Sequence, residues 1–224
     1  MTIGIILQAR TGSTRLPRKI LNEIQGETLL NRCFSNMLRL QDSKLKLYLA
    51  TTTLEEDKIL IPVAKSFGIT PFCGNPTDLI HRFHSIAQQD GLSVICRLTG
   101  DNPFIDYKFI LHSLKCFDDQ NLDFPTIATS RGGSLAPGLD VETFNLSALK
   151  KAENQANSVD REHITTGMTE ERGFKVLPLN GRQIHSEYTR LTVDLPIDLE
   201  IANDYALKFD LNHRSVDNFE TGES

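Results

Sequence analysis

Short apolar runs alternate with amphipathic stretches along nearly the whole chain, and this alternation limits the possible folds more than any other feature. Runs typical of buried strands occur at residues 3–7, 45–50, 69–73 and 93–98. Between them, apolar residues recur at helical spacing over residues 27–40, 55–67 and 78–89, the last with Thr77 as its predicted N-cap. Strands that alternate with helices predict an α/β fold in which a mostly parallel sheet is covered on both faces.

The second half of the chain is less regular in its pattern. We expect strands over residues 124–128, 139–144, 174–179 and 190–194, and helices over residues 106–117, 146–155, 160–171 and 198–209. The order of elements between residues 124 and 180 leaves room for antiparallel strands. Because the sequence has no repeat and no obvious linker, we predict one domain over residues 1–211, followed by a polar C-terminal tail at 212–224.

The loop after the first predicted strand is dense in cations. In QARTGSTRLPRK, residues 8–19, four cations accompany one glycine and three hydroxyl side chains. A polyphosphate needs this combination of backbone N–H groups, hydroxyl donors and fixed positive charge, and cations so close together repel one another unless an anion lies among them. The sequence therefore predicts phosphate binding here rather than a solvated basic turn.

The composition excludes several classes of partner. The net charge is −5, so the basic loop is a local feature of an acidic protein, and we expect no nucleic-acid binding. The chain is 39% hydrophobic and 24% charged, as soluble globular proteins are. Arg10 interrupts the first apolar run, and no stretch approaches the roughly 20 apolar residues of a membrane helix. We therefore expect a cytoplasmic protein without membrane insertion.

Neither the cysteines nor the histidines form the pattern of a zinc site. The cysteines include no CxxC pair and lie within apolar patterns, which predicts buried free thiols at Cys33, Cys73, Cys96 and Cys116. His81 and His84 have the i, i+3 spacing that a metal site can use, but no third ligand motif accompanies them. We do not predict zinc.

Two aspartates directly follow predicted strands, at the carboxyl ends where ligands gather in parallel sheets. Asp101 lies in RLTGDNP, residues 97–103, and Asp194 lies in RLTVDLPID, residues 190–198. Taken singly, each has a structural explanation, because Asp101 can cap a turn and Asp194 can cap the last helix, although Asp198 lies nearer its start. Taken with the cationic loop, they predict one or two Mg²⁺ ions that bridge the carboxylates and a nucleoside triphosphate.

Two weaker clusters complete the candidates. Asp140 and Glu142 are two residues apart on a predicted strand and therefore share a face. They either orient sugar hydroxyls or hold a counter-charge, or they form the exposed polar face of an edge strand. Glu162 and His163 lie near the start of a predicted helix and are candidates for substrate contact, although a lone histidine is more often structural.

These motifs together resemble those of the cytidylyltransferase family that includes spore-coat polysaccharide biosynthesis proteins. That family is related to the enzymes that activate sialic acid and 3-deoxy-octulosonic acid (Kdo) as CMP-sugars. The similar blocks occur in family order over nearly the whole chain: QARTGSTRLPRK at 8–19, RLTGDNP at 97–103, GLDVE at 138–142, REHIT at 161–165 and RLTVDLPID at 190–198. One departure is Arg18, where relatives often have a small residue. It either adds a phosphate contact or points to solvent.

The resemblance implies a three-layer α/β/α sandwich with a mostly parallel sheet, a Rossmann-like nucleotidyltransferase fold of the glycosyltransferase-A type. It also implies a homodimer with Mg²⁺ as cofactor, bound by Asp101 and Asp194. By position, the implied catalytic residues are Arg10, Arg15, Lys19 and Asp101. The nucleotide-binding set is Gln8, Ala9, Arg10, Gly12, Ser13, Arg15, Lys19, Thr99 and Gly100. The substrate-binding set is Asp140, Glu142, Glu162 and His163.

The implied activity is transfer of CMP from CTP to a sugar with release of pyrophosphate, for surface polysaccharide or glycan biosynthesis. An acidic keto sugar such as a nonulosonate or a Kdo-like sugar is one candidate acceptor, with Arg131 or Arg190 as its cationic contact. A metal-dependent glycosyltransferase is an alternative, but such enzymes commonly carry a DxD motif, which this chain lacks. A nucleotidyltransferase that uses another nucleoside triphosphate, and a non-catalytic nucleotide- or sugar-binding protein, are the others.

Overall fold

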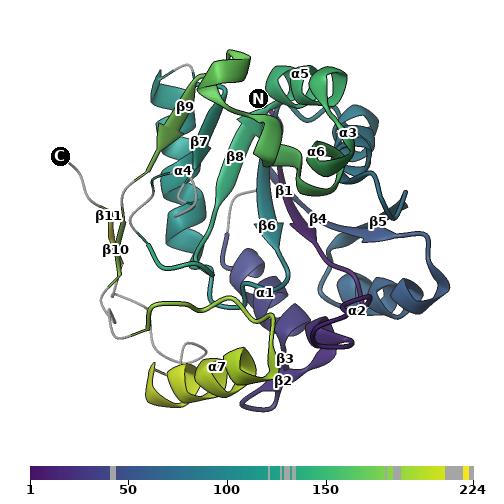
Figure 1. The fold of residues 1–224 in the computed structure, drawn as a ribbon, viewed down its shortest axis with the longest axis vertical. Coiled ribbons are helices and arrows are strands. Elements are labelled where there is room, and N and C mark those ends of the chain that lie inside the picture. Colours follow the sequence, from purple (N-terminus) through teal and green to yellow (C-terminus); the bar gives the residue numbers. More distant parts are fainter. Residues whose placement is uncertain are drawn as a thin grey trace.

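A mostly parallel sheet forms the centre of the computed structural model, which describes residues 1–40, 44–120, 122–126, 128, 132, 135–179, 181–183, 188–209 and 219–221. The sheet has seven strands in the order β5-β4-β1-β6-β8-β7-β9, of which only β8 runs antiparallel to its neighbours (Figure 1). The strands are β1 (Ile3–Gln8), β4 (Leu45–Thr52), β5 (Thr70–Gly74), β6 (Val94–Thr99), β7 (Phe124–Thr126), β8 (Glu142–Asn145) and β9 (Val176–Pro178). Two small antiparallel pairs are β2 (Glu23–Ile24) with β3 (Glu27–Thr28), and β10 (Gly181–Gln183) with β11 (Phe219–Thr221).

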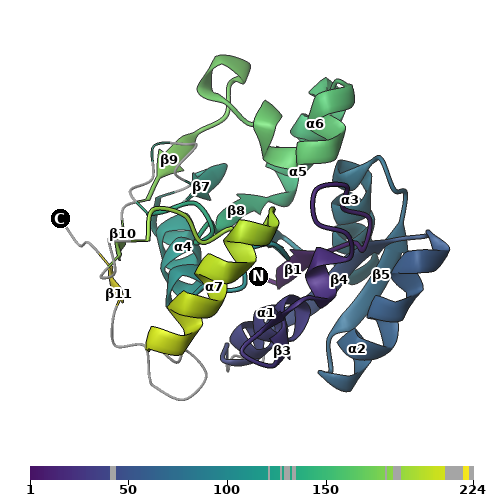
Figure 2. The same ribbon diagram turned by 60° about the horizontal axis from the view of Figure 1, so that its bottom comes forward.

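Alternate residues of the central strands face two separate apolar cores. In β1, Ile5 and Leu7 belong to one core and Ile6 to the other, and all three are fully buried. The first core includes residues of α1 (Leu29–Leu38), α2 (Leu60–Ser66), α4 (Tyr107–Gln120) and α7 (Pro196–Phe209). The second includes residues of α3 (Leu79–Asp90) and α5 (Leu146–Gln155). Helices thus cover both faces of the sheet (Figure 2), and the predicted three-layer α/β/α sandwich is confirmed. No helix in the described ranges is long and apolar enough to cross a membrane.

The predicted strand at residues 190–194 is wrong. The segment has no regular secondary structure and lies outside the sheet, where single backbone hydrogen bonds tie Leu191 to Pro137 (2.7 Å) and Val193 to Asp101 (2.8 Å). Leu191 and Val193 are both buried in the first core. Their alternation with polar residues therefore reflects the burial of these two side chains and not the pairing of a strand in the sheet.

The predicted helix at residues 160–171 is also wrong in its extent. The structure has a short helix α6 (Ser158–His163), followed by two 3₁₀ turns, η4 (Ile164–Gly167) and η5 (Glu170–Arg172). The backbone of Ile164 has φ 24°, outside the right-handed helical region, so the helix stops there. Glu162 and His163 consequently end a helix instead of opening one.

The other predicted helices and strands are present, the helix at residues 146–155 with the predicted ends and the rest with shifted ends, and one predicted cap is wrong. The side chain of Asp78, not that of Thr77, caps α3 by accepting from the His81 backbone N–H at 2.9 Å. Thr77 instead donates to Asn75 Oδ1. The predicted helix at residues 55–67 begins as a 3₁₀ turn, η2 (Glu55–Ile59), which continues into α2.

The cysteines are free thiols, as predicted, but they are not all buried. Cys33 and Cys96 are buried, Cys116 is half-buried and Cys73 is exposed, because Cys73 lies on the edge strand β5 and faces out of the core. Burial raises the pKa of the Cys33 and Cys96 thiols well above the ordinary value.

The two histidines of α3 have separate partners. His84 Nδ1 lies 2.6 Å from Glu153 Oε2 of α5, whereas His81 contacts Ser85 on its own helix. In the described part of the chain, no three histidine, cysteine, aspartate or glutamate side chains are grouped so that they could hold a metal ion.

Candidate active site

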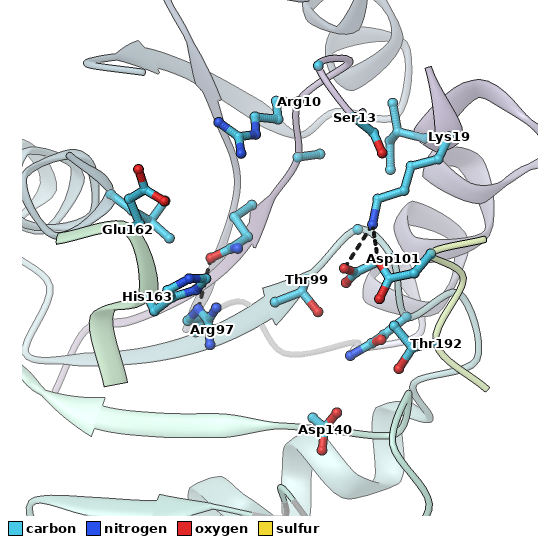
Figure 3. Close-up of a pocket in the computed structure, with 18 of the residues that line it drawn as sticks. Arg10, Ser13, Lys19, Arg97, Thr99, Asp101, Asp140, Glu162, His163 and Thr192 are labelled. Atoms are coloured by element: carbon cyan, nitrogen blue, oxygen red, sulfur yellow. Dashed lines mark hydrogen bonds and ion pairs between the residues drawn. The ribbon is translucent and has the colours of Figure 1, made fainter. Parts of the chain in front are cut away.

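A cleft with a volume of about 530 Å³ opens at the carboxyl ends of β1 and β6. All the site residues predicted from the sequence line it, although they come from five separate stretches of chain (Figure 3): Gln8, Ala9, Arg10, Gly12, Ser13, Arg15, Lys19, Thr99, Gly100, Asp101, Asp140, Glu142, Glu162, His163 and Asp194. The fold thus brings the cationic loop, both aspartates and the weaker polar clusters to one place.

The ammonium group of Lys19 joins the two aspartates. Lys19 Nζ donates to Asp101 Oδ2 at 3.0 Å and to Asp194 Oδ1 at 2.8 Å, and dashed lines in Figure 3 mark these contacts. Arg15 and Arg190 also contact the Asp194 carboxylate, at 3.1 and 2.7 Å. Burial acts to raise the pKa of Asp194, but the bond and charge of Lys19, with the charges of Arg15 and Arg190, outweigh it and lower that pKa. Two carboxylates distant in sequence therefore converge on one cation.

A buried carboxylate holds the start of the cationic loop. Asp57 of η2 is fully buried, and its Oδ1 accepts from the backbone N–H of Thr11 at 2.6 Å and from the Thr11 hydroxyl at 2.7 Å. Its Oδ2 accepts from the Thr52 hydroxyl at the end of β4. Asp57 therefore fastens the loop to the neighbouring strand. The sequence pattern offered no signal for this role, because an acidic residue in the first turn of a predicted helix is ordinary.

Arg18 takes no part in the cleft. Its backbone is in the left-handed region (φ 53°, ψ 29°), its N–H donates to Thr11 O, and its side chain is exposed and does not line the cleft. The turn it makes leads into the 3₁₀ turn η1 (Lys19–Leu21), which directs Lys19 inward. Of the two readings of Arg18, the structure supports the one in which it points to solvent.

Two glycines let distant segments meet at the cleft. A Cβ at Gly100 would come within 2.6 Å of Ile20 Cδ1, so the missing side chain admits the first loop against the turn after β6. A Cβ at Gly138 would come within 2.3 Å of Thr192 N, and Gly138 has φ 107°, which disfavours any other residue. Gly138 thus allows the segment that carries Asp194 to lie beside the segment before β8.

A second ion pair lies deeper in the cleft. Arg97 of β6 pairs with Glu142 of β8 and donates from Nε to Gln8 Oε1 at 2.8 Å. The Thr165 hydroxyl donates to the other Glu142 oxygen, Oε1, at 2.9 Å. Gln8 and Glu142 are therefore both bound to protein groups. Asp140 lies before β8, not on it, so the prediction that it shares a strand face with Glu142 is wrong, and its Oδ2 accepts from Gly138 N–H.

Glu162 and His163, at the end of α6, line the cleft across from Lys19 and Asp101 (Figure 3). Arg190 contacts Asp194 but does not itself line the cleft, and the other predicted cation, Arg131, lies outside the described residues.

Several residues that line the cleft were not indicated by the sequence pattern. Chief among them are Arg97, Thr192 and three residues from the junction of β5 and α3: Pro76, Leu79 and Arg82. An arginine within an amphipathic helix ordinarily lies on its solvent-exposed face, so nothing in the sequence pattern placed Arg82 in the cleft.

Comparison with known proteins is consistent with this geometry. The family model described as Cytidylyltransferase matches residues 4–213. The spore coat polysaccharide biosynthesis protein SpsF of Bacillus subtilis is 29% identical over 204 residues, which cover 88% of this chain and 83% of SpsF. The 3-deoxy-manno-octulosonate cytidylyltransferase of Chlorobium chlorochromatii is 30% identical over 124 residues, which cover 54% of this chain and 48% of that protein.

A solved structure is similar over nearly the whole chain. The cytidylyltransferase of Leptospira borgpetersenii superimposes with a TM-score of 0.81 at 31% identity, over 93% of this chain and 88% of that one. The likeness confirms the Rossmann-like nucleotidyltransferase fold expected from the sequence. The chain therefore belongs to the cytidylyltransferase family and is a nucleotidyltransferase.

Proposed function

We propose that this enzyme transfers CMP from CTP to a sugar and releases pyrophosphate. The observation that carries the proposal is the convergence of Asp101 and Asp194 on Lys19, beside a loop rich in cations and hydroxyl groups. The names of two relatives support it, because one is a 3-deoxy-manno-octulosonate cytidylyltransferase and the other a polysaccharide biosynthesis protein.

The cationic loop would hold the triphosphate. Arg10, Arg15 and Lys19 line the cleft with Gly12 and Ser13, so positive charge and hydroxyl and N–H donors face the same space. Charge-assisted hydrogen bonds from such groups would orient the α-phosphate for in-line attack by a sugar oxygen. The same cations would stabilise the pyrophosphate as it leaves.

The two aspartates fit a Mg²⁺ ion. Their oxygens reach one ammonium group, so they point at a common position, and carboxylate oxygens are the ligands that Mg²⁺ prefers. Mg²⁺ keeps several waters and is commonly held by one or two carboxylates plus substrate phosphates, which matches a site with only two protein ligands. When bound, the ion would neutralise phosphate charge and polarise the α-phosphate.

The acceptor sugar would occupy the part of the cleft lined by Asp140, Glu142, Glu162 and His163. Asp140 and Glu162 offer acceptors for sugar hydroxyls, while Glu142 acts through Arg97, which it holds in place. An acidic keto sugar is the acceptor class we propose, because the relative from Chlorobium chlorochromatii is a 3-deoxy-manno-octulosonate cytidylyltransferase.

Pyrophosphate release tests this function. The purified enzyme with CTP and Mg²⁺ should release pyrophosphate only when an acidic keto sugar is added, and neutral aldoses serve as the control panel. Thermal shift with CTP, UTP, GTP and ATP provides a second readout, because a ligand that binds the folded state raises the melting temperature. Stabilisation by nucleotide sugars alone would contradict the proposal and favour a glycosyltransferase.

A further inference from the structure

Asp198 accepts two hydrogen bonds at the start of the last helix, and both come from the segment that carries Asp194. Asp198 Oδ2 accepts from the backbone N–H groups of Asp194 and Leu195, each at 2.9 Å, and Asp198 is only 8% exposed. Because α7 begins at Pro196, Asp198 is its third residue, a position from which an acidic side chain reaches back to free N–H groups. This cap therefore fixes the backbone of Asp194 as well as the helix.

Arg190 joins the same two aspartates from outside the cleft. Its Nη2 lies 2.7 Å from Asp194 Oδ2, and its Nε lies 3.6 Å from Asp198 Oδ1. Asp194 lines the cleft, whereas Arg190 and Asp198 do not. One planar guanidinium thus spans a carboxylate in the cleft and a carboxylate behind it.

The two oxygens of Asp194 consequently have different partners. Oδ1 lies 2.8 Å from Lys19 Nζ and 3.1 Å from Arg15 Nη2, and both of these residues line the cleft. Oδ2 contacts Arg190 instead. A carboxylate that is held at one oxygen and at its own backbone N–H cannot rotate without the loss of one of these contacts. The protein therefore holds Oδ2 and leaves Oδ1 among the groups that a ligand would meet.

The segment before Asp194 is tied to the other aspartate of the cleft. The backbone N–H of Val193 donates to Asp101 O at 2.8 Å, and the Val193 side chain is fully buried in the first core. The backbones that carry Asp101 and Asp194 are thus fixed relative to each other. This matters for an ion that both would hold, because Mg²⁺ demands near-ideal octahedral geometry.

We propose that Arg190 and Asp198 are positioning residues, which hold the Asp194 carboxylate with Oδ1 toward the cleft so that it can share a Mg²⁺ ion with Asp101. The inference rests on the proposed function, in which the two aspartates bind this ion. Groups that contact a metal ligand from behind orient it, and their removal lowers metal affinity by about 10- to 100-fold.

The charge of Arg190 gives this proposal a distinctive sign. By its charge alone, an arginine beside a metal ligand repels the metal ion, so its removal would raise metal affinity. A positioning role predicts the opposite. Stability is a poor guide here, because the Arg190 side chain is 43% exposed and such ion pairs contribute little to it.

Calorimetric titration with CTP, in Mg²⁺ and in EDTA, tests this role. The ratio of the two dissociation constants measures how much the metal ion contributes to nucleotide binding. In Arg190→Met and in Asp198→Ala this ratio should fall by about tenfold or more, while the affinity for CTP in EDTA stays at the wild-type value. Asp198→Asn keeps an oxygen that can accept from both N–H groups, so it should recover most of the ratio.

Arg172→Met is the matched control. The Arg172 side chain is 37% exposed, similar to that of Arg190, and it pairs at 2.7 Å with the buried carboxylate of Asp160. Neither Arg172 nor Asp160 lines the cleft. The ratio for this variant should equal that of the wild-type enzyme.

The outcomes separate this inference from the proposed function. A wild-type enzyme that binds no CTP would contradict the proposed function, and the inference would fall with it. Equal binding of CTP in Mg²⁺ and in EDTA would contradict the metal assignment of Asp101 and Asp194, with the same consequence. A wild-type metal effect that is unchanged or larger in Arg190→Met would overturn only the positioning role. A lowered melting temperature of Asp198→Ala with an unchanged ratio would make Asp198 a helix cap only. If Asp198→Ala does not fold, Arg190→Met alone decides the question.

Discussion

Two clusters of ion-paired side chains line the same cleft, and they differ in how far they are buried and in how many further hydrogen bonds they make. In the outer cluster, Lys19 bridges Asp101 and Asp194, with side chains 18%, 29% and 13% exposed. In the inner cluster, Arg97 and Glu142 are 12% and 9% exposed. Gln8 and Thr165 add further hydrogen bonds to the inner pair. The outer cluster is instead flanked by Arg15, whose side chain is 62% exposed.

This difference suggests that the outer cluster serves the reaction and that the inner cluster stabilises the fold. An ion pair that is partly accessible contributes less to stability than a buried one, so the Lys19 cluster can exchange its internal contacts for those of a phosphate or a cation at a lower cost than the inner pair. A buried pair with its hydrogen bonds satisfied is costly to break, because the remaining charge has no water to solvate it. We expect changes in the outer cluster to remove activity and changes in the inner cluster to remove stability.

The largest effect is expected for Asp101→Asn. The amide keeps the shape of the side chain but loses the negative charge, so pyrophosphate release with CTP should fall by about a hundred- to a thousandfold. The melting temperature should stay close to that of the wild-type enzyme, because the ion pair with Lys19 is accessible. A continuous pyrophosphate assay and thermal unfolding measure the two. Retention of full activity would contradict the catalytic assignment.

The opposite result is expected for Glu142→Ala. Removal of the carboxylate leaves Arg97 buried with one neutral acceptor on Gln8, and the free energy of unfolding should fall by about 3–5 kcal/mol. Urea denaturation followed by circular dichroism measures the loss. Glu142→Gln is the matched variant, because it keeps an acceptor for Thr165 and should lose less stability. Equal stability of Glu142→Ala and wild type would end the distinction between the clusters.

The sequence predicted the outer cluster better than the inner one for a physical reason. Asp101 and Lys19 directly follow strands or sit in a charge-dense loop, and the topology of a parallel sheet brings such positions together. Arg97 lies within a strand, where an isolated charge gives no pattern. Its pairing with Glu142 depends on β8 running antiparallel beside β6, and strand order is set by packing across the whole sheet.

Asp57 and Asp194 mark the limits of prediction in another way. Asp194 was predicted at the right place in the cleft for a wrong local reason, since its segment is not a strand. Asp57 was missed because Thr11 is 46 residues away from it in sequence and comes within hydrogen-bond distance only in the folded chain. Neither this contact nor the one with Thr52 leaves a mark in the local pattern. Local hydrophobic periodicity predicts helices and strands, whereas contacts between these elements can be predicted only once the fold is known.

Asp57→Asn should have an intermediate effect on both readouts. The amide cannot accept from Thr11 N–H, Thr11 Oγ1 and Thr52 Oγ1 together without placing its own donor against one of them. The free energy of unfolding should fall by about 1–3 kcal/mol, and the KM for CTP should rise because the loop is held less firmly. Steady-state kinetics at fixed acceptor sugar and urea denaturation measure these changes. Glu55→Gln is the control, since Glu55 lies in the same turn with its side chain 86% exposed. Unchanged KM with lowered stability would leave Asp57 a structural residue only.

The smallest effect is expected from protonation of the outer cluster. Lys19 and the neighbouring arginines lower the pKa of Asp194 below its ordinary value, against the effect of burial, so its charge stabilises the folded state above the unfolded-state pKa of about 3.9. That contribution is lost as the pH falls through the lower folded-state pKa. Without Mg²⁺, the free energy of unfolding should therefore be level near neutral pH and decline below about pH 4. Asp194→Asn should flatten part of the decline, by about 1 kcal/mol, because only the carboxylate of the wild-type protein loses a charge over this range. Urea denaturation between pH 7 and pH 3 measures the difference, and identical profiles for the two proteins would show that Asp194 adds nothing to stability even where its pKa is lowered.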